Sequence, residues 1–118
     1  MAQLSTLGIV RTMSEFASIQ QLWKEHMSRP FPRALAGEEI DGECLVLIDS
    51  TAAGCITTFL GGSRAPHLDA KRQQVLGDCV ASLTRICPQL AAEHRIYFDT
   101  LREVSERVVR HCQRGLDD

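Results

Sequence analysis

The sequence predicts a mainly α-helical fold, a small bundle of about four helices in a single domain that spans residues 1–118. Three observations support this prediction. Apolar residues recur at steps of three and four along most of the chain, as they do on one face of a helix. Capping residues, glycines and prolines separate these apolar stretches at helix-like intervals. Leu, Ile, Val and Phe make up about a quarter of the chain, above the roughly 20% below which disorder is typical.

The N-terminal quarter is expected to hold a short apolar strand or ordered arm, followed by a helix. Residues 4–10 are mostly apolar and of strand length. Thr12 and Glu15 then have the spacing of a capping box, in which a hydroxyl and a carboxylate bond to each other's free backbone amides. Pro30 and Pro32 end the helix, because a proline disfavours the helical conformation in the residue before it. The predicted buried face consists of Phe16, Ile19, Leu22 or Trp23, and His26 or Met27.

The middle of the chain leaves the choice between strand and helix open. Residues 33–43 contain two glycines and are expected to form a loop or a frayed turn. Residues 44–48 form a short apolar run, which fits either a short strand or the buried start of a helix. Residues 49–51 are Asp-Ser-Thr, all typical N-cap residues, and they predict a helix over 52–60.

The C-terminal half is expected to form an antiparallel pair of helices. Asp69 is a favourable N-cap for the first of them, and Pro88 separates it from a second helix over 89–113. Gly115 then fits the cap at the C-terminal end. Both helices carry an apolar stripe, and the two stripes together contain Leu76, Cys79, Val80, Leu83, Ile86, Cys87, Leu90, His94, Tyr97, Leu101, Val104, Val108 and Cys112.

Charge and composition argue against several classes of protein. The formal net charge of −2, from 13 basic and 15 acidic residues, gives no basic field for DNA or RNA. Residues 1–10 lack the features of a signal peptide, and no stretch approaches the roughly 18 apolar residues that cross a membrane. The five cysteines include no Cys-x-x-Cys pair, which is typical of reduced thiols. We therefore expect a cytoplasmic protein with no membrane contact, and the charge argues mildly against a nucleic-acid partner.

Four short motifs occur between residues 44 and 101, about half of the chain. They are Leu-Val-Leu-Ile-Asp at 45–49, Ala-Gly-Cys-Ile-Thr-Thr-Phe-Leu at 53–60, Leu-Asp at 68–69 and Leu-Gly-Asp-Cys at 76–79. In these motifs the chain resembles small actinobacterial proteins to which no activity is attached. The resemblance implies a bacterial protein of the cytoplasm and implies no particular chemistry.

The cysteines and histidines do not have the spacing of metal ligands. A structural zinc site normally has paired ligands two to four residues apart. Cys79 and Cys87 are instead eight residues apart, about 12 Å along a helix. His111 and Cys112 are adjacent, and adjacent residues of a helix point in different directions. We therefore expect cysteines that belong to the core, no metal site and no cofactor.

A small-molecule pocket is the first candidate for a functional site. His94, Tyr97 and Trp23 are polar-tipped residues on the predicted inner faces, where they would line a pocket or lie at its solvated rim. Cys55 is a further candidate, as a lining residue or a nucleophile, since a thiol near a helix start can have a lowered pKa. Burial among its apolar neighbours explains this cysteine equally simply.

An anion site is the second candidate, formed by Arg64, Lys71 and Arg72. Basic residues in the first turn of a helix oppose its dipole unless they meet an anion. The glycine-rich stretch before them lacks the spacing of a Walker loop. A solvated turn would explain the same residues.

The function that the sequence favours is contact with other proteins, with self-association into a homodimer or another homo-oligomer. Several apolar residues flank the first helix without an evident partner in the chain: Leu4, Leu7, Ile9, Val10, Phe31 and Leu35. An exposed apolar stripe marks an interface, and a two-fold pair would cover it, although the same residues could close over the C-terminal helices.

Two other functions compete with this one, and catalysis stays open. The first is a small-molecule-binding protein or small enzyme with a pocket near His94, Tyr97 and Trp23. The second is a DNA-binding regulator. Residues 61–68, between the second and third predicted helices, form a longer loop than the three- to four-residue turn of a helix-turn-helix motif.

Overall fold

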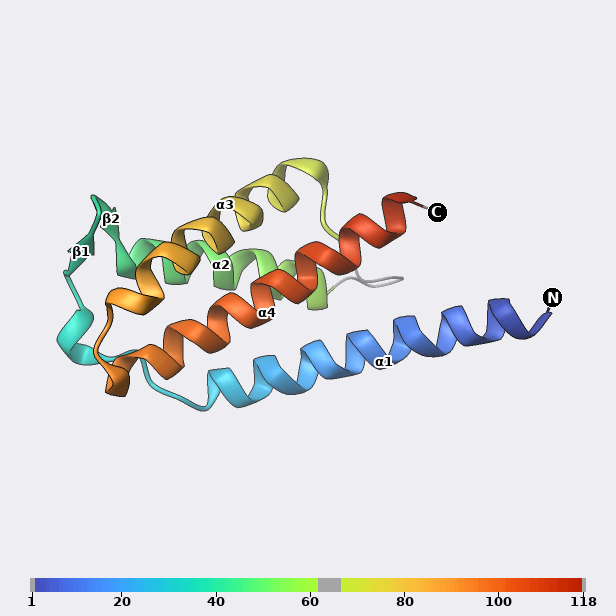
Figure 1. Ribbon diagram of the computed structural model, residues 1–118, viewed down its shortest axis with the longest axis horizontal. Coiled ribbons are helices and arrows are strands. Elements are labelled where there is room, and N and C mark those ends of the chain that lie inside the picture. The colour runs from blue at the N-terminus through green and yellow to red at the C-terminus, as the bar shows by residue number, and fades with distance from the viewer. Residues whose placement is uncertain (1, 62–66, 118) are drawn as a thin grey trace.

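The computed structural model describes residues 2–61 and 67–117, and the side chains of residues 14–61 and 67–114. The described part of the chain contains four α-helices and one short hairpin (Figure 1). The helices are α1 (Ala2–Met27), α2 (Leu45–Leu60), α3 (Ala70–Ile86) and α4 (Ala92–Asp117), and the strands are β1 (Glu39–Ile40) and β2 (Glu43–Cys44). Two 3-10 helices occur at Arg33–Leu35 and Cys87–Gln89. The mainly helical bundle predicted from the sequence is confirmed.

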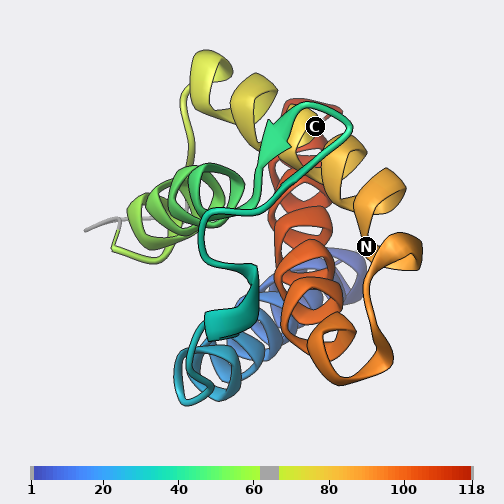
Figure 2. The ribbon, with the colours of Figure 1, turned by 90° about the vertical axis from the view of Figure 1, so that its left-hand side faces the viewer.

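Helix α4 is the central element of the bundle. It contacts α1, α2 and α3, and Figure 2 shows these three helices arranged around it. Helices α3 and α4 run antiparallel, as the sequence predicts, and α1 also runs antiparallel to α4 (Figure 1). The predicted stripes of α3 and α4 are buried against their neighbours, except that Val80 and His94 are half-buried.

Helix α1 begins earlier than the sequence predicts. The strand or arm expected at residues 4–10 is wrong, because the helix is continuous from Ala2, and Thr12 lies within it rather than at its start. Leu4 and Leu7 continue the three-residue step of a helix, and a run of seven residues is too short for periodicity to exclude a strand. The N-terminal turns of α1 extend along the long axis of the molecule, past the end of α4 (Figure 1).

A β-hairpin with two residues in each strand lies at residues 39–44, where the sequence predicts a loop or frayed turn over 33–43. Glu39 pairs with Cys44 and Ile40 with Glu43. The turn between them has Asp41 at φ 54° and Gly42 at φ 80°. Asp-Gly is the dipeptide that such turns favour, because both central residues need a positive φ.

The short strand expected near residues 44–48 is confirmed as β2, but residues 45–48 belong to α2, whose start lies before the one expected at residue 52. Strand β2 ends at Cys44, and α2 begins at Leu45. Leu45, Ile48 and Ala52 are buried, so the three- and four-residue steps of one helical face start at residue 45. Asp49 therefore lies inside the helix and is not its N-cap.

The ends of α3 and α4 are partly as predicted. The Asp69 side chain caps α3, since its Oδ1 accepts a hydrogen bond of 2.8 Å from the backbone N–H of Arg72. Pro88 lies in the 3-10 turn that separates the two helices. The C-terminal cap expected at Gly115 is wrong, because α4 continues to Asp117. A single glycine inside a helix costs only about 1 kcal/mol relative to alanine, which a long helix tolerates.

The six apolar residues that flank the first helix divide into two groups. Phe31 and Leu35 are half-buried and pack against the core, as expected if they close over the helices. The side chains of Leu4, Leu7, Ile9 and Val10 lie outside the described residues. None of the described helices is both long enough and apolar enough to cross a membrane.

Candidate functional site

A cluster of aromatic side chains surrounds His26, where the C-terminal end of α1 meets α2 and α4. The ring of Trp23 stacks on that of His26 with 5.3 Å between their centroids, and the Tyr97 ring lies 4.4 Å from His26. The Tyr97 hydroxyl donates a hydrogen bond of 2.8 Å to Oδ1 of Asp49 on α2. Phe31 contacts the Tyr97 ring edge-on. We call these five residues the His26 cluster.

The two titratable rings of the His26 cluster are held in their neutral forms. His26 is only 2% exposed, and its Nδ1 is buried with no hydrogen-bond partner among the described residues. Burial lowers the pKa of His26, and the nearby charge of Asp49 opposes this only in part. Burial and the hydrogen bond to Asp49 raise the pKa of Tyr97. The cluster is therefore suited to packing and orientation rather than to proton transfer at neutral pH.

The structure brings together two of the four residues predicted to bind a ligand. Trp23 and Tyr97 lie on either side of His26. His94, in the first turn of α4, approaches the carboxylate of Glu93, with 3.5 Å between Nε2 and Oε1. Cys55 lies six residues beyond Asp49 on α2, about 9 Å along the helix axis, and belongs to a different site.

Three members of the His26 cluster are not assigned to a ligand site by the sequence: His26, Asp49 and Phe31. His26 was predicted on the buried face of the first helix, but only as an alternative to Met27. Asp49 was assigned to a helix cap. A histidine on an apolar helical face is a usable signal, because a buried imidazole needs polar or aromatic neighbours.

Cys55 lines a groove of about 490 Å³ between α2 and α3, which we call the α2/α3 groove. Lys71 and Arg72, two residues of the predicted anion site, line the same groove. Apart from the neighbouring backbone of α2 itself, no atom lies within 4 Å of the position that a Cβ at Gly54 would occupy, so this glycine keeps the groove open. Its other lining residues are Ser50, Thr51, Thr58, Asp69 and Val75.

The described residues of the α2/α3 groove include no activated nucleophile. Burial raises the pKa of the Cys55 thiol, which lies 3.8 Å from the Arg72 carbonyl oxygen and can donate to it, so the thiol is protonated and weakly nucleophilic. Asp69 bonds to the backbone N–H and the guanidinium of Arg72. Its carboxylate therefore weakens the attraction of an anion to the start of α3. Arg64, the third residue of the predicted anion site, lies outside the described residues.

Three further cysteines, Cys79, Cys87 and Cys112, are also protonated, because burial raises the pKa of each thiol. All five cysteines are free, and four of them are buried. Burial raises the pKa of Cys79 to about 11 and that of Cys87 to about 12. Among the described side chains, those of residues 14–61 and 67–114, no three of His, Cys, Asp or Glu come close enough to hold a metal ion. The described cysteines therefore contribute to packing.

Comparisons of the chain with protein-family models, with curated proteins and with solved structures give no match. The resemblance to small actinobacterial proteins therefore stays a prediction. The function has to be inferred from the residues and their geometry.

Proposed function

We propose that the protein acts through contacts with other proteins and self-associates through the N-terminal part of α1. The observation that carries the proposal is the extension of α1 past the rest of the bundle (Figure 1). Helix α1 has 26 residues, about 39 Å at 1.5 Å per residue. Its C-terminal half packs on the bundle through the buried side chains of Ile19 and His26.

The composition of the extending segment also supports self-association. Residues 2–13 include Leu4, Leu7, Ile9 and Val10, and Arg11 is their one charged residue. Helices shorter than about 12–15 residues are marginal in water without packing, so a partner for this segment would stabilise it. A second copy offers the same apolar segment, and two-fold pairing of identical surfaces is the commonest form of oligomer. A bacterial protein of the cytoplasm fits this proposal.

Leu7→Asp is expected to convert a homodimer of the full chain into a monomer, because a buried charge at the pair interface would lack a partner. Sedimentation equilibrium across a range of concentrations measures the mass. The wild-type chain should approach twice the monomer mass as concentration rises. Ser5→Asp is the matched control, since it adds the same charge to the same segment on the face of the helix opposite Leu7 and should leave the mass unchanged. A wild-type monomer at every concentration, or equal behaviour of the two variants, would contradict self-association.

The alternative function is binding of a small molecule, and the α2/α3 groove supports it. Its volume of about 490 Å³ lies in the range of ligand sites, and hydroxyl, thiol and basic groups share its walls. Of the four residues predicted to bind a ligand, Cys55 is the one that lines this groove, whereas Trp23 and Tyr97 are packed on His26. Enzymatic activity and a role as a DNA-binding regulator remain weaker proposals, because the groove offers no activated nucleophile and the chain carries a net charge of −2.

Gly54→Leu is expected to abolish ligand binding in the α2/α3 groove, because its side chain would occupy the open space there. The helix should tolerate the change, since leucine is a better helix former than glycine. Thermal unfolding with a panel of metabolites measures binding. A compound that raises the Tm of the wild-type protein should not raise that of the variant. Thr57→Leu, at an exposed position of α2, is the control and should keep the shift. Equal shifts in wild type and Gly54→Leu would exclude the groove as the site.

A further inference from the structure

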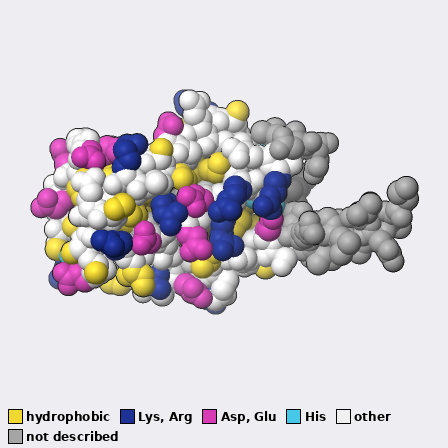
Figure 3. Space-filling view, in the orientation of Figure 1, with side chains coloured by type: hydrophobic (Ala, Val, Ile, Leu, Met, Phe, Trp, Pro, Cys, Tyr) yellow, Lys and Arg dark blue, Asp and Glu magenta, His cyan; other side chains and the backbone are white. Residues whose placement is uncertain are grey.

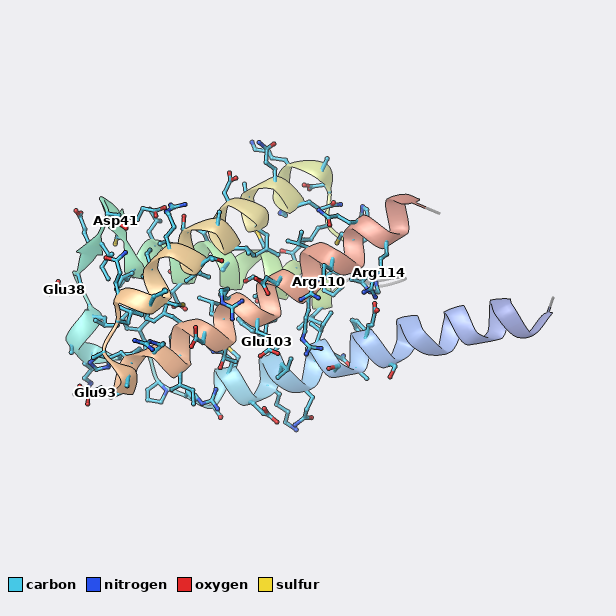
Figure 4. The ribbon with its side chains drawn as sticks, viewed as in Figure 1. Glu38, Asp41, Glu93, Glu103, Arg110 and Arg114 are labelled. Atoms are coloured by element: carbon cyan, nitrogen blue, oxygen red, sulfur yellow. The ribbon has the colours of Figure 1, made fainter. Side chains whose placement is uncertain are left out.

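A separate cavity of about 160 Å³ lies between α1 and the C-terminal half of α4, and we call it the α1/α4 cavity. Its apolar surface includes Ile19, which is almost fully buried. Its polar lining comes from two helices and consists of Glu15, Arg107, Arg110, His111 and Arg114. The three arginines follow one another at steps of three and four, which places them on one face of α4. Figure 4 shows Arg110 and Arg114 on the side of α4 that faces α1.

One carboxylate from α1 joins the two helices at this cavity. Glu15 contacts the guanidinium of Arg114 through one oxygen. Its other oxygen lies 3.3 Å from Nδ1 of His111. The His111 side chain is largely enclosed, and its ring also packs edge-on against Phe59. The position of α1 against α4 therefore builds the cavity from residues that lie far apart in the sequence.

The described charges around the α1/α4 cavity leave an excess of positive charge. The residues that line the cavity include three arginines and one glutamate, Glu15, in a chain whose formal net charge is −2. The ion pairs are Arg102 with Glu106 at 2.9 Å, Arg107 with Glu103 at 3.2 Å, Arg110 with Glu106 at 3.7 Å, and Arg114 with Glu15. Figure 3 shows a group of basic side chains over α4 in this view.

The arginines of the cavity keep hydrogen-bond donors for a ligand. A guanidinium has five N–H donors, and an ion pair of this kind uses only some of them. The side chains of Arg110 and Arg114 are 60% and 62% exposed, so their donors are accessible. The distance of 3.7 Å between Arg110 and Glu106 exceeds that of a good hydrogen bond, which leaves this guanidinium loosely held.

We propose that the α1/α4 cavity binds a small oxyanion of the phosphate class, either free phosphate or the phosphoryl group of a monoester. The planar fork of arginine matches the oxygens of phosphate, and several forks around one cavity meet more than one of them. A phosphate dianion also neutralises the local positive excess more fully than a single carboxylate does. This site is independent of self-association.

Inorganic phosphate is expected to raise the Tm of the wild-type chain by about 5 °C at ten times its Kd, compared with chloride at equal ionic strength. Arg110→Ala and Arg114→Ala should each remove most of this shift. Arg110→Lys keeps the charge but lacks the fork, and should weaken binding by about tenfold. Arg33→Ala is the matched control, because Arg33 is an exposed arginine at the opposite end of the bundle, and it should keep the full shift.

Equal stabilisation by phosphate and chloride would overturn the proposal. So would a loss of the Tm shift in Arg33→Ala as large as that in Arg110→Ala and Arg114→Ala. If an arginine variant does not fold, the ring signals of His111 in the wild-type protein provide a second measurement by nuclear magnetic resonance. Their chemical shifts should change on addition of phosphate, and unchanged chemical shifts would also overturn the proposal. Tighter binding of phenyl phosphate than of inorganic phosphate identifies the ligand as a monoester, and weaker binding identifies it as free phosphate.

Discussion

Phe98→Ala is expected to lower the free energy of unfolding by about 3–5 kcal/mol. Phe98 is 0% exposed, and its ring packs edge-on against Phe31 and Tyr97 with centroid distances of 5.7 and 5.1 Å. Loss of the ring leaves a cavity beside the His26 cluster. The surrounding rings are fixed by one another and by the hydrogen bond from Tyr97 to Asp49, so they can fill the cavity only in part. Small domains have a total stability of about 5–15 kcal/mol, so the loss is a large fraction of it.

Urea unfolding followed by circular dichroism measures this change. Ile96→Ala is the matched control, because Ile96 lies two residues before Phe98 on the same helix and is 55% exposed. It should change the free energy of unfolding by about 0.5 kcal/mol or less. Similar losses in the two variants would contradict the packing of α4 described above.

The sequence predicted α3 and α4 well because their signals are long and agree with one another. Each apolar stripe covers more than three turns, and the stripe of α3 follows a good N-cap at Asp69. Such a stripe has few alternative structures that could bury it. The antiparallel arrangement followed from the short turn at Pro88, which leaves the two helices adjacent.

The starts of α1 and α2 could not be predicted with the same accuracy, because the deciding interactions are not local. Residues 4–10 and 44–48 are short apolar runs, and periodicity does not separate strand from helix over so few residues. Burial of Leu45 and Ile48 against the bundle decides in favour of helix at α2. Asp41 and Gly42 carried a hairpin signal that the sequence interpretation did not use.

The candidate sites depended even more on tertiary structure. Tyr97 and Asp49 are 48 residues apart in sequence, and His111 and Glu15 are 96 apart. No spacing rule links residues at such separations. Cys55 and the pair Lys71 and Arg72 were assigned to two separate sites, and the packing of α2 on α3 places them in one groove.

Acidification is expected to destabilise the protein below about pH 6.5 through His26 and His111, whose pKa values are both lowered by burial. Above that pH both rings are neutral in the folded and unfolded states, so this contribution to stability is complete. Below it the unfolded chain binds protons that the folded protein does not.

The free energy of unfolding then falls by up to about 1.4 kcal/mol per pH unit for each histidine, until the pKa of the folded state is reached. The charges that act on His26 are Asp49 from α2, which favours the protonated ring, and Arg29, which opposes it. The Tyr97 hydroxyl is neutral and already donates to Asp49, so it does not compensate a charged imidazole.

His26→Phe is expected to flatten this pH dependence, because phenylalanine keeps an aromatic ring beside Trp23 and Tyr97 and removes the group that titrates. Urea unfolding at several values between about pH 7.5 and about pH 5 gives the slope for each variant. Ile96→Ala is the control, since Ile96 does not titrate and is 55% exposed, so its replacement should leave the slope as in the wild type. If His26→Phe retains the wild-type slope, the imidazole of His26 is not held neutral by the fold. The pH dependence of the free energy of unfolding would then come from His111. Because the ring of His111 lines the α1/α4 cavity, addition of phosphate would change this dependence in the same unfolding experiment.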